Sequence, residues 1–160
     1  MTELITYAVP VALGAAALAA PLFIGAAAKW RRFATDDAGK WFEDERMPAM
    51  LRNAVLYMNE KSISMAKPVH LEGRVDQVYL LESGMLMPVD TKTRDRHVVY
   101  DSDIMQLSMY AMILAYTTNR TVCDAGFVRT VIRTEQSRDV RYHFVRLLPE
   151  SAIVQAMNKP

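Results

Sequence analysis

The 160-residue chain contains one cysteine, Cys123, and its charges nearly cancel, with a formal net charge of +1 at pH 7. A single cysteine excludes a disulfide within the chain, which agrees with a reducing compartment. It also excludes a four-cysteine iron–sulfur cluster held by one chain. The balanced charge gives no overall electrostatic sign of nucleic-acid binding. We see no internal repeat and no low-complexity linker, and the length allows one globular domain.

Charged residues are also absent from 4–28, a run rich in alanine, leucine, valine and glycine. As a helix this run would be about 37 Å long, enough to cross a hydrocarbon core of about 30 Å. Lys29 to Arg32 then form a basic stop that includes an interfacial tryptophan. We therefore predict a transmembrane helix and basic stop at 1–32. The positive-inside rule places the following domain in the cytoplasm, as a single-pass protein of the inner (cytoplasmic) membrane.

Two other interpretations of this segment stay open. A cleavable signal peptide normally carries positive charge before its apolar run, whereas the early charge here is Glu3. The alanines at 26–28 nevertheless resemble a cleavage site. The other interpretation is a buried helix of a soluble domain, although such helices are rarely this long without a charged residue.

The middle of the chain predicts a β-hairpin that carries two carboxylates and a lysine. Two apolar runs, 75–81 and 85–92, flank a Glu-Ser-Gly turn signal. Asp76 lies at the start of the first run, and Asp90 and Lys92 lie at the end of the second. Because side chains alternate along a strand, Asp90 and Lys92 point to the same face. Carboxylates suit Mg²⁺ or Mn²⁺, and a neighbouring lysine can position a water, so the pattern indicates metal-assisted phosphodiester hydrolysis.

Three short elements in this order resemble the PD-(D/E)xK nuclease superfamily and, within it, the RecB-like exonucleases. The elements are Gly73-Arg74-Val75-Asp76, Asp90-Thr91-Lys92, and the pair Gln106 and Tyr110. The resemblance covers 60–134 and implies a DNA nuclease that uses Mg²⁺ or Mn²⁺ and lacks the iron–sulfur cluster of several relatives. The implied catalytic residues are Asp76, Asp90, Lys92, Gln106 and Tyr110. The implied metal ligands are Asp76, Asp90, the backbone carbonyl of Thr91 and, as a further candidate, Glu45.

The sequence departs from many RecB-like nucleases because no histidine precedes His70. Glu45 or Glu60 would have to replace the metal-binding histidine of the first helix. DNA is the implied partner, and a protein partner of unknown identity is compatible with a tethered domain that must grip DNA. The residues expected to contact DNA are Arg94, Arg96, Arg129 and Arg133. We interpret His97 as a solvated loop residue and His143 as structural.

Hydrophobic periodicity predicts an α/β (α+β) fold, and the resemblance adds a restriction-endonuclease-like αβββαβ core preceded by one transmembrane helix. We expect a juxtamembrane helical segment at 33–60 and the nuclease-like domain at 61–160. The expected elements are a helix at 41–58, strands at 62–65, 71–81 and 85–92, a helix capped by Asp101 or Ser102 and ending near 117, strands at 125–133 and 140–148, and a helix at 149–157. Pro48 either breaks the first of these helices or marks the first turn of a second one.

Three functional hypotheses follow from the sequence. The first is a membrane-anchored, Mg²⁺-dependent DNA nuclease. The second is a nuclease fold without catalysis that serves as a membrane-tethered nucleic-acid-binding or assembly subunit. The third is an unrelated membrane-anchored α+β domain in which the three elements coincide by chance.

Overall fold

The structure is a computed structural model that describes residue 43 and residues 45–158. The chain divides into two compact units, Met1–Lys40 and Trp41–Pro160, and only the second contains described residues. The transmembrane helix predicted at 1–32 therefore lies outside the described residues. Within the described part, no helix has the length and apolar character needed to cross a membrane.

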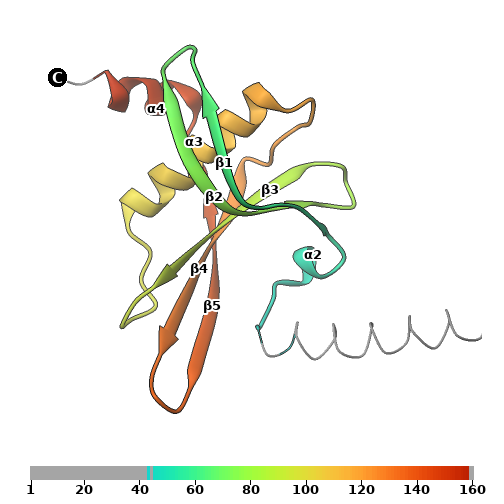
Figure 1. The fold of residues 1–160 in the computed structure, drawn as a ribbon, viewed down its shortest axis with the longest axis vertical. Helices are drawn as coiled ribbons and strands as arrows, with labels where there is room; N and C mark the ends of the chain where they lie inside the picture. Colours follow the sequence, from blue (N-terminus) through green and yellow to red (C-terminus); the bar gives the residue numbers. More distant parts are fainter. Residues whose placement is uncertain (1–42, 44, 159–160) are drawn as a thin grey trace, which may run out of the picture. The chain divides into compact units, whose positions relative to one another are not determined.

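The second unit is a mixed α/β fold built on a five-stranded sheet with the strand order β1-β2-β3-β4-β5 (Figure 1). Its elements are α2 (Ala49–Arg52), β1 (Val55–Met65), β2 (Leu71–Leu80), β3 (Leu86–Thr93), α3 (Asp101–Thr117), β4 (Ala125–Arg133), β5 (Arg138–Arg146) and α4 (Glu150–Met157). Neighbouring strands are antiparallel except for the pair β3 and β4, which is parallel. A parallel pair needs a long connection, and here α3 supplies the crossover.

The core lies on both faces of this sheet. Helix α3 contacts β1, β2, β3 and β4 and therefore covers one face. On the other face Met47 and Leu51, from the segment around α2, pack against Met87, Val89 and neighbouring side chains. The alternation along β3 explains the two layers, because Met87 and Val89 face the α2 side while Asp90 faces α3.

Across residues 45–58, the helix predicted at 41–58 is wrong except at Ala49–Arg52. Residues from Val55 onward belong to β1, and α2 is a four-residue helix that follows Pro48. Methionines at helical spacing produced the helical pattern, but the long pairing of β1 with β2 decides the conformation of this edge strand. The domain boundary expected between 60 and 61 consequently falls inside β1.

The remaining elements agree with the predicted order, with small differences at their ends. Helix α3 begins at Asp101 with Tyr100 at its N-cap, so neither Asp101 nor Ser102 is the cap. The carboxylate of Asp103 instead accepts a hydrogen bond from the Tyr100 backbone N–H at 2.8 Å. Strand β5 ends at Arg146 and not at 148.

Candidate active site

The two candidate metal-binding carboxylates meet where β2 and β3 separate. The last pair of the β2–β3 ladder is Gln77 with Val89, and Asp76 and Asp90 are the next residues on the two strands. The backbone N–H of Thr91 donates to Asp76 Oδ2 at 2.7 Å. The Asp76 side chain thus takes the place of a backbone carbonyl of β2 as the acceptor for Thr91. This contact fixes the Asp76 carboxylate beside β3.

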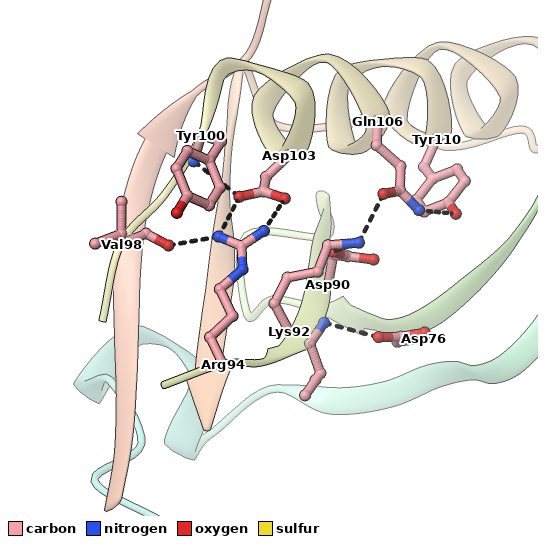
Figure 2. A network of polar contacts seen from close by, with 10 residues as sticks. Asp76, Asp90, Lys92, Arg94, Val98, Tyr100, Asp103, Gln106 and Tyr110 are labelled. Atoms are coloured by element: carbon pink, nitrogen blue, oxygen red, sulfur yellow. Dashed lines mark hydrogen bonds and ion pairs between the residues drawn. The ribbon is translucent and has the colours of Figure 1, made fainter. Parts of the chain in front are cut away.

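A continuous polar network connects β3 to α3 (Figure 2). The ammonium of Lys92 lies 2.9 Å from Asp90 Oδ2 and donates to Gln106 Oε1 at 2.7 Å. The side-chain amide of Gln106 in turn donates to the Tyr110 hydroxyl at 2.5 Å. Gln106 and Tyr110 meet because residues four apart share one helix face. The structure therefore brings Asp90, Lys92, Gln106 and Tyr110 together, with Asp76 beside them.

Gly73, the first residue of the first element, has a direct steric role in this network. A Cβ atom at this position would lie 2.5 Å from Cε1 of Tyr110. Only glycine lets the tyrosine ring approach the backbone of β2 this closely. Two of the three sequence elements are therefore linked by packing, which sequence spacing alone does not reveal.

Asp90 carries the most unusual electrostatics of the site. The residue is 2 % exposed, and within the described residues the Lys92 ammonium, 2.9 Å away, is the one charged partner of its Oδ2 atom, which accepts no other hydrogen bond. Burial raises the pKa of the Asp90 carboxyl above its ordinary 3.8; Lys92 opposes this shift, and the negative charges of Asp76 and Asp103 add to it. Keeping such a buried carboxylate ionised costs free energy of folding, and a bound cation would offset this cost.

A polar cavity of about 420 Å³ opens beside Asp76. Its lining residues are Glu45, Asn59, Glu60, Asp76, Gln77, Thr91, Arg129, Arg138 and Tyr142. Both glutamates considered as replacements for the first-helix histidine, Glu45 and Glu60, therefore lie in the same cavity as Asp76. Glu60 has a left-handed backbone with φ 48°, an uncommon conformation for a non-glycine residue.

The divalent cation implied by the resemblance fits the donor chemistry of Asp76 and Asp90. All the side-chain atoms of Asp76 and Asp90 that could bind a metal are oxygens, and one of them is the Asp90 Oδ2 atom described above. Across residues 45–158, no group of three or more His, Cys, Asp or Glu side chains is arranged to hold a metal ion. Mg²⁺ is commonly bound through one or two carboxylates with waters in the other positions, so two carboxylates satisfy its needs. Thr91 contacts Asp76 through its amide, and Glu45 pairs with two arginines.

The four arginines expected to contact DNA occupy different environments. Arg94 forms a two-pronged ion pair with Asp103, at 2.6 and 2.8 Å, and its guanidinium lies 4.5 Å from the centre of the Tyr100 ring. Arg129 pairs with Glu45 and is largely buried. Arg96 and Arg133 are exposed. Arg94 thus secures the start of α3, and the two exposed arginines are the ones directly available to a phosphate.

His97 is not a solvated loop residue, contrary to expectation. Its side chain is 7 % exposed; Nδ1 lies 2.7 Å from Thr130 Oγ1 and Nε2 lies 2.9 Å from Asp139 Oδ2. Thr130 Oγ1 also lies 2.9 Å from Nε2 of His143. Burial, together with the charges of His97 and Arg141, lowers the pKa of His143. Thr130 pairs with Lys92 in the β3–β4 ladder, so this buried network borders the candidate site.

Comparison with known proteins does not assign the chain to a family. No family model matches the sequence, and no curated protein matches it. The crystal structure of SSO0001 is similar over 62 % of this chain, with 15 % sequence identity and a TM-score of 0.45. The chain spans 46 % of the length of that protein.

Proposed function

We propose that this chain is a membrane-anchored, metal-dependent DNA nuclease of the RecB-like branch of the PD-(D/E)xK superfamily, with a restriction-endonuclease-like core. The observation that carries the proposal is the Asp90 carboxylate, which is buried and, within the described part of the chain, has only the Lys92 ammonium, 2.9 Å away, as a partner for Oδ2. Strained electrostatics of this kind are typical of functional sites. Asp76 beside it supplies a second carboxylate.

The arrangement suits hydrolysis of a phosphodiester. A water oxygen would form a bond to phosphorus while one P–O ester bond breaks, and the departing alkoxide would take a proton. Mg²⁺, when bound, would lower the pKa of a coordinated water and neutralise charge on the phosphate. Asp76 and Asp90 would hold the cation, and Lys92 would orient the attacking water. Gln106 and Tyr110 would keep the Lys92 ammonium in place through their hydrogen bonds.

One observation favours a second function. Among the described residues, no group of three or more potential side-chain ligands is arranged for a metal. Glu45, the candidate third carboxylate, is engaged by Arg129 and Arg138. A catalytically inactive nuclease-fold module, acting as a membrane-tethered nucleic-acid-binding or assembly subunit, would share this geometry.

A cleavage assay on the full-length protein separates the two functions. Labelled single- and double-stranded DNA would be incubated with Mg²⁺, Mn²⁺ or EDTA, and Mn²⁺ binding would be measured in parallel. Asp76→Asn and Asp90→Asn should remove metal binding and cleavage together. Lys92→Ala should keep metal binding and reduce cleavage by about 10²-fold, the usual scale for a positioned acid–base group. Asp95→Asn, in an exposed loop, is the matched control.

The outcomes are distinct. Cleavage that requires the metal and both aspartates supports the nuclease. Mn²⁺ binding without cleavage of either DNA form contradicts catalysis and favours the binding module. Failure to bind any divalent cation, with the fold intact, contradicts the proposed metal site.

The membrane anchor is tested separately. If 1–32 spans the bilayer, the full-length protein should sediment with membranes and remain there after carbonate extraction. Recovery of the full-length chain in the soluble fraction without detergent would contradict the anchor and leave the nuclease proposal unaffected.

A further inference from the structure

Glu45 is held by two arginines in a manner that resembles the binding of an anionic ligand. Its Oε2 atom accepts a hydrogen bond from Arg129, and its Oε1 atom accepts one from Arg138. Burial opposes ionisation of this carboxyl, but the hydrogen bonds and charges of the two arginines outweigh burial, and the pKa of Glu45 lies below its ordinary 4.5. One carboxylate is thus held by two guanidinium groups.

This arginine pair lies in the cavity that reaches the candidate metal site. Arg129 on β4 is the ladder partner of Thr91 on β3, and the amide of Thr91 contacts Asp76. Arg138 begins β5, and both arginines line the cavity with Asp76 and Thr91. A chain of phosphates entering along β3 and β4 would therefore meet the arginine pair in the same cavity as Asp76.

The chemistry of the pair matches a phosphodiester. The planar fork of arginine matches the oxygens of carboxylate and phosphate groups equally well. The two non-bridging oxygens of a backbone phosphate could accept from Arg129 and Arg138 as the two oxygens of Glu45 do. The Arg138 side chain is 44 % exposed, so the pair is open to solvent on one side.

Glu45 lies in a turn that comes just before the buried residues of the α2 segment, and Arg46 of the same turn pairs with Asp139 at 3.0 Å. The Arg46 backbone N–H closes the turn onto the Glu43 carbonyl at 3.0 Å, and Arg46 adopts a left-handed conformation with φ 50°. This conformation is unfavourable for a residue with a side chain, so opening of the turn would relieve it. The next residues, Met47 and Leu51, are fully buried and anchor the segment on the sheet.

We propose that Arg129 and Arg138 form a clamp for a phosphate of the nucleic-acid backbone, and that Glu45 occupies this clamp as a built-in competitor until nucleic acid displaces it. The identity of the ligand rests on the proposed function. The clamp is a binding feature separate from the two carboxylates of the metal site, and it makes the free protein a weaker binder than its arginines alone would allow.

The test measures DNA binding by the full-length protein in EDTA, so that neither metal nor cleavage contributes. Fluorescence anisotropy with a labelled 20-nucleotide single strand and the corresponding duplex would give the dissociation constant over a range of salt concentrations. Glu45→Gln should tighten binding about tenfold and steepen the salt dependence by about 0.7 to 0.9 units for one further phosphate contact. Adding Arg129→Gln or Arg138→Gln should abolish the gain.

Matched variants separate this effect from general charge and from unfolding. Glu135→Gln removes the same charge from the exposed β4–β5 turn and should change affinity little. Thermal melting reports the fold of each variant. Where Glu45→Gln does not fold, Arg138→Gln in the otherwise unchanged protein serves instead, compared with Arg146→Gln at the exposed far end of β5. Only Arg138→Gln should then weaken binding, by about threefold or more.

Each result supports or overturns the clamp. Unchanged or weaker binding by folded Glu45→Gln overturns it, and so does an equal gain from Glu135→Gln. Stabilisation of Glu45→Gln by pyrophosphate without tighter DNA binding identifies a small-anion site and overturns the nucleic-acid assignment. Absence of DNA binding by every variant overturns the proposed function as well, whereas loss of cleavage alone leaves the clamp intact.

Discussion

Glu45 and Asp90 are both buried carboxylates, yet their surroundings shift their pKa values in opposite directions. Glu45 has an arginine at each oxygen, and its pKa is lowered. Asp90 has a raised pKa, and among the described residues Lys92 is the one charged partner of its Oδ2 atom. A buried charge with a partner at each oxygen holds a structure together, whereas one with fewer partners costs stability and is typical of a place that binds a ligand. Substitutions should therefore move the stability of the two regions in opposite directions.

The largest effect on stability should come from the arginine pair. Arg129→Met removes one partner of Glu45 and leaves its carboxylate buried, so we expect the free energy of unfolding to fall by about 3 kcal/mol. Denaturant unfolding of the full-length protein at pH 7 measures this loss. Arg133→Met, at the exposed end of the same strand, should change it by less than about 0.5 kcal/mol. Equal losses from both variants would remove the distinction between Glu45 and a surface carboxylate.

A slightly smaller effect should follow from crowding the Tyr110 end of the polar network. Gly73→Ala forces the tyrosine ring away from β2, and overpacking of this kind costs about 1–3 kcal/mol. The shifted ring would also disturb the hydrogen bond to Gln106. In a double-mutant cycle, Tyr110→Ala should cancel most of the cost of Gly73→Ala. Additive losses would show that the glycine and the tyrosine are not coupled.

Asp90→Asn should act in the opposite direction and stabilise the fold by about 1 kcal/mol at pH 7, because it removes a poorly satisfied buried charge. The folded-state pKa of Asp90 is raised above 3.8, so its charge penalises folding above that pH and not below it. The advantage of the variant should consequently shrink as the pH falls toward 3.8. A loss of stability at pH 7 would mean that the contact between Asp90 and Lys92 is a supporting ion pair.

The smallest effect should come from His143, whose pKa is lowered from 6.5 chiefly by burial. The unfolded chain binds a proton more readily than the folded one, so stability should decline as the pH falls below about 6.5. His143→Gln should remove part of this decline between pH 7 and pH 5. If the two proteins lost stability equally as the pH falls, the predicted contribution of His143 would be wrong.

The sequence predicts the Asp90 side of this comparison well and the Glu45 side poorly, for a physical reason. Asp90 and Lys92 are related by strand alternation, Gln106 and Tyr110 by one helical turn, and Asp76 by the register of a hairpin. Each relation is local and has a fixed period. The order of elements from β2 to α4 followed from the same local patterns.

Contacts that depend on packing between distant segments have no such period. Glu45 lies 84 residues from Arg129 and 93 from Arg138, and His97 lies 33 residues from Thr130. Which of many polar side chains meet is decided only once the sheet is complete. The wrong helix at 41–58 also hides the contacts of Glu45 with Arg129 and Arg138. A helix continuing through Val55 would place Glu45 elsewhere relative to the sheet.

The parallel pairing of β3 with β4 also bears on the order in which the described part of the chain can assemble during synthesis. Every residue of the network from Asp76 to Tyr110 leaves the ribosome before β4. The ion pairs of Glu45, in contrast, cannot form until Arg129 and Arg138 have been synthesised. Until β4 arrives, β3 is an unpaired edge, and exposed edges in slowly closing sheets invite association between chains. We therefore expect refolding to be limited by the closure of α3 over the sheet and the docking of the β4–β5 hairpin, and to be most sensitive to protein concentration before that step.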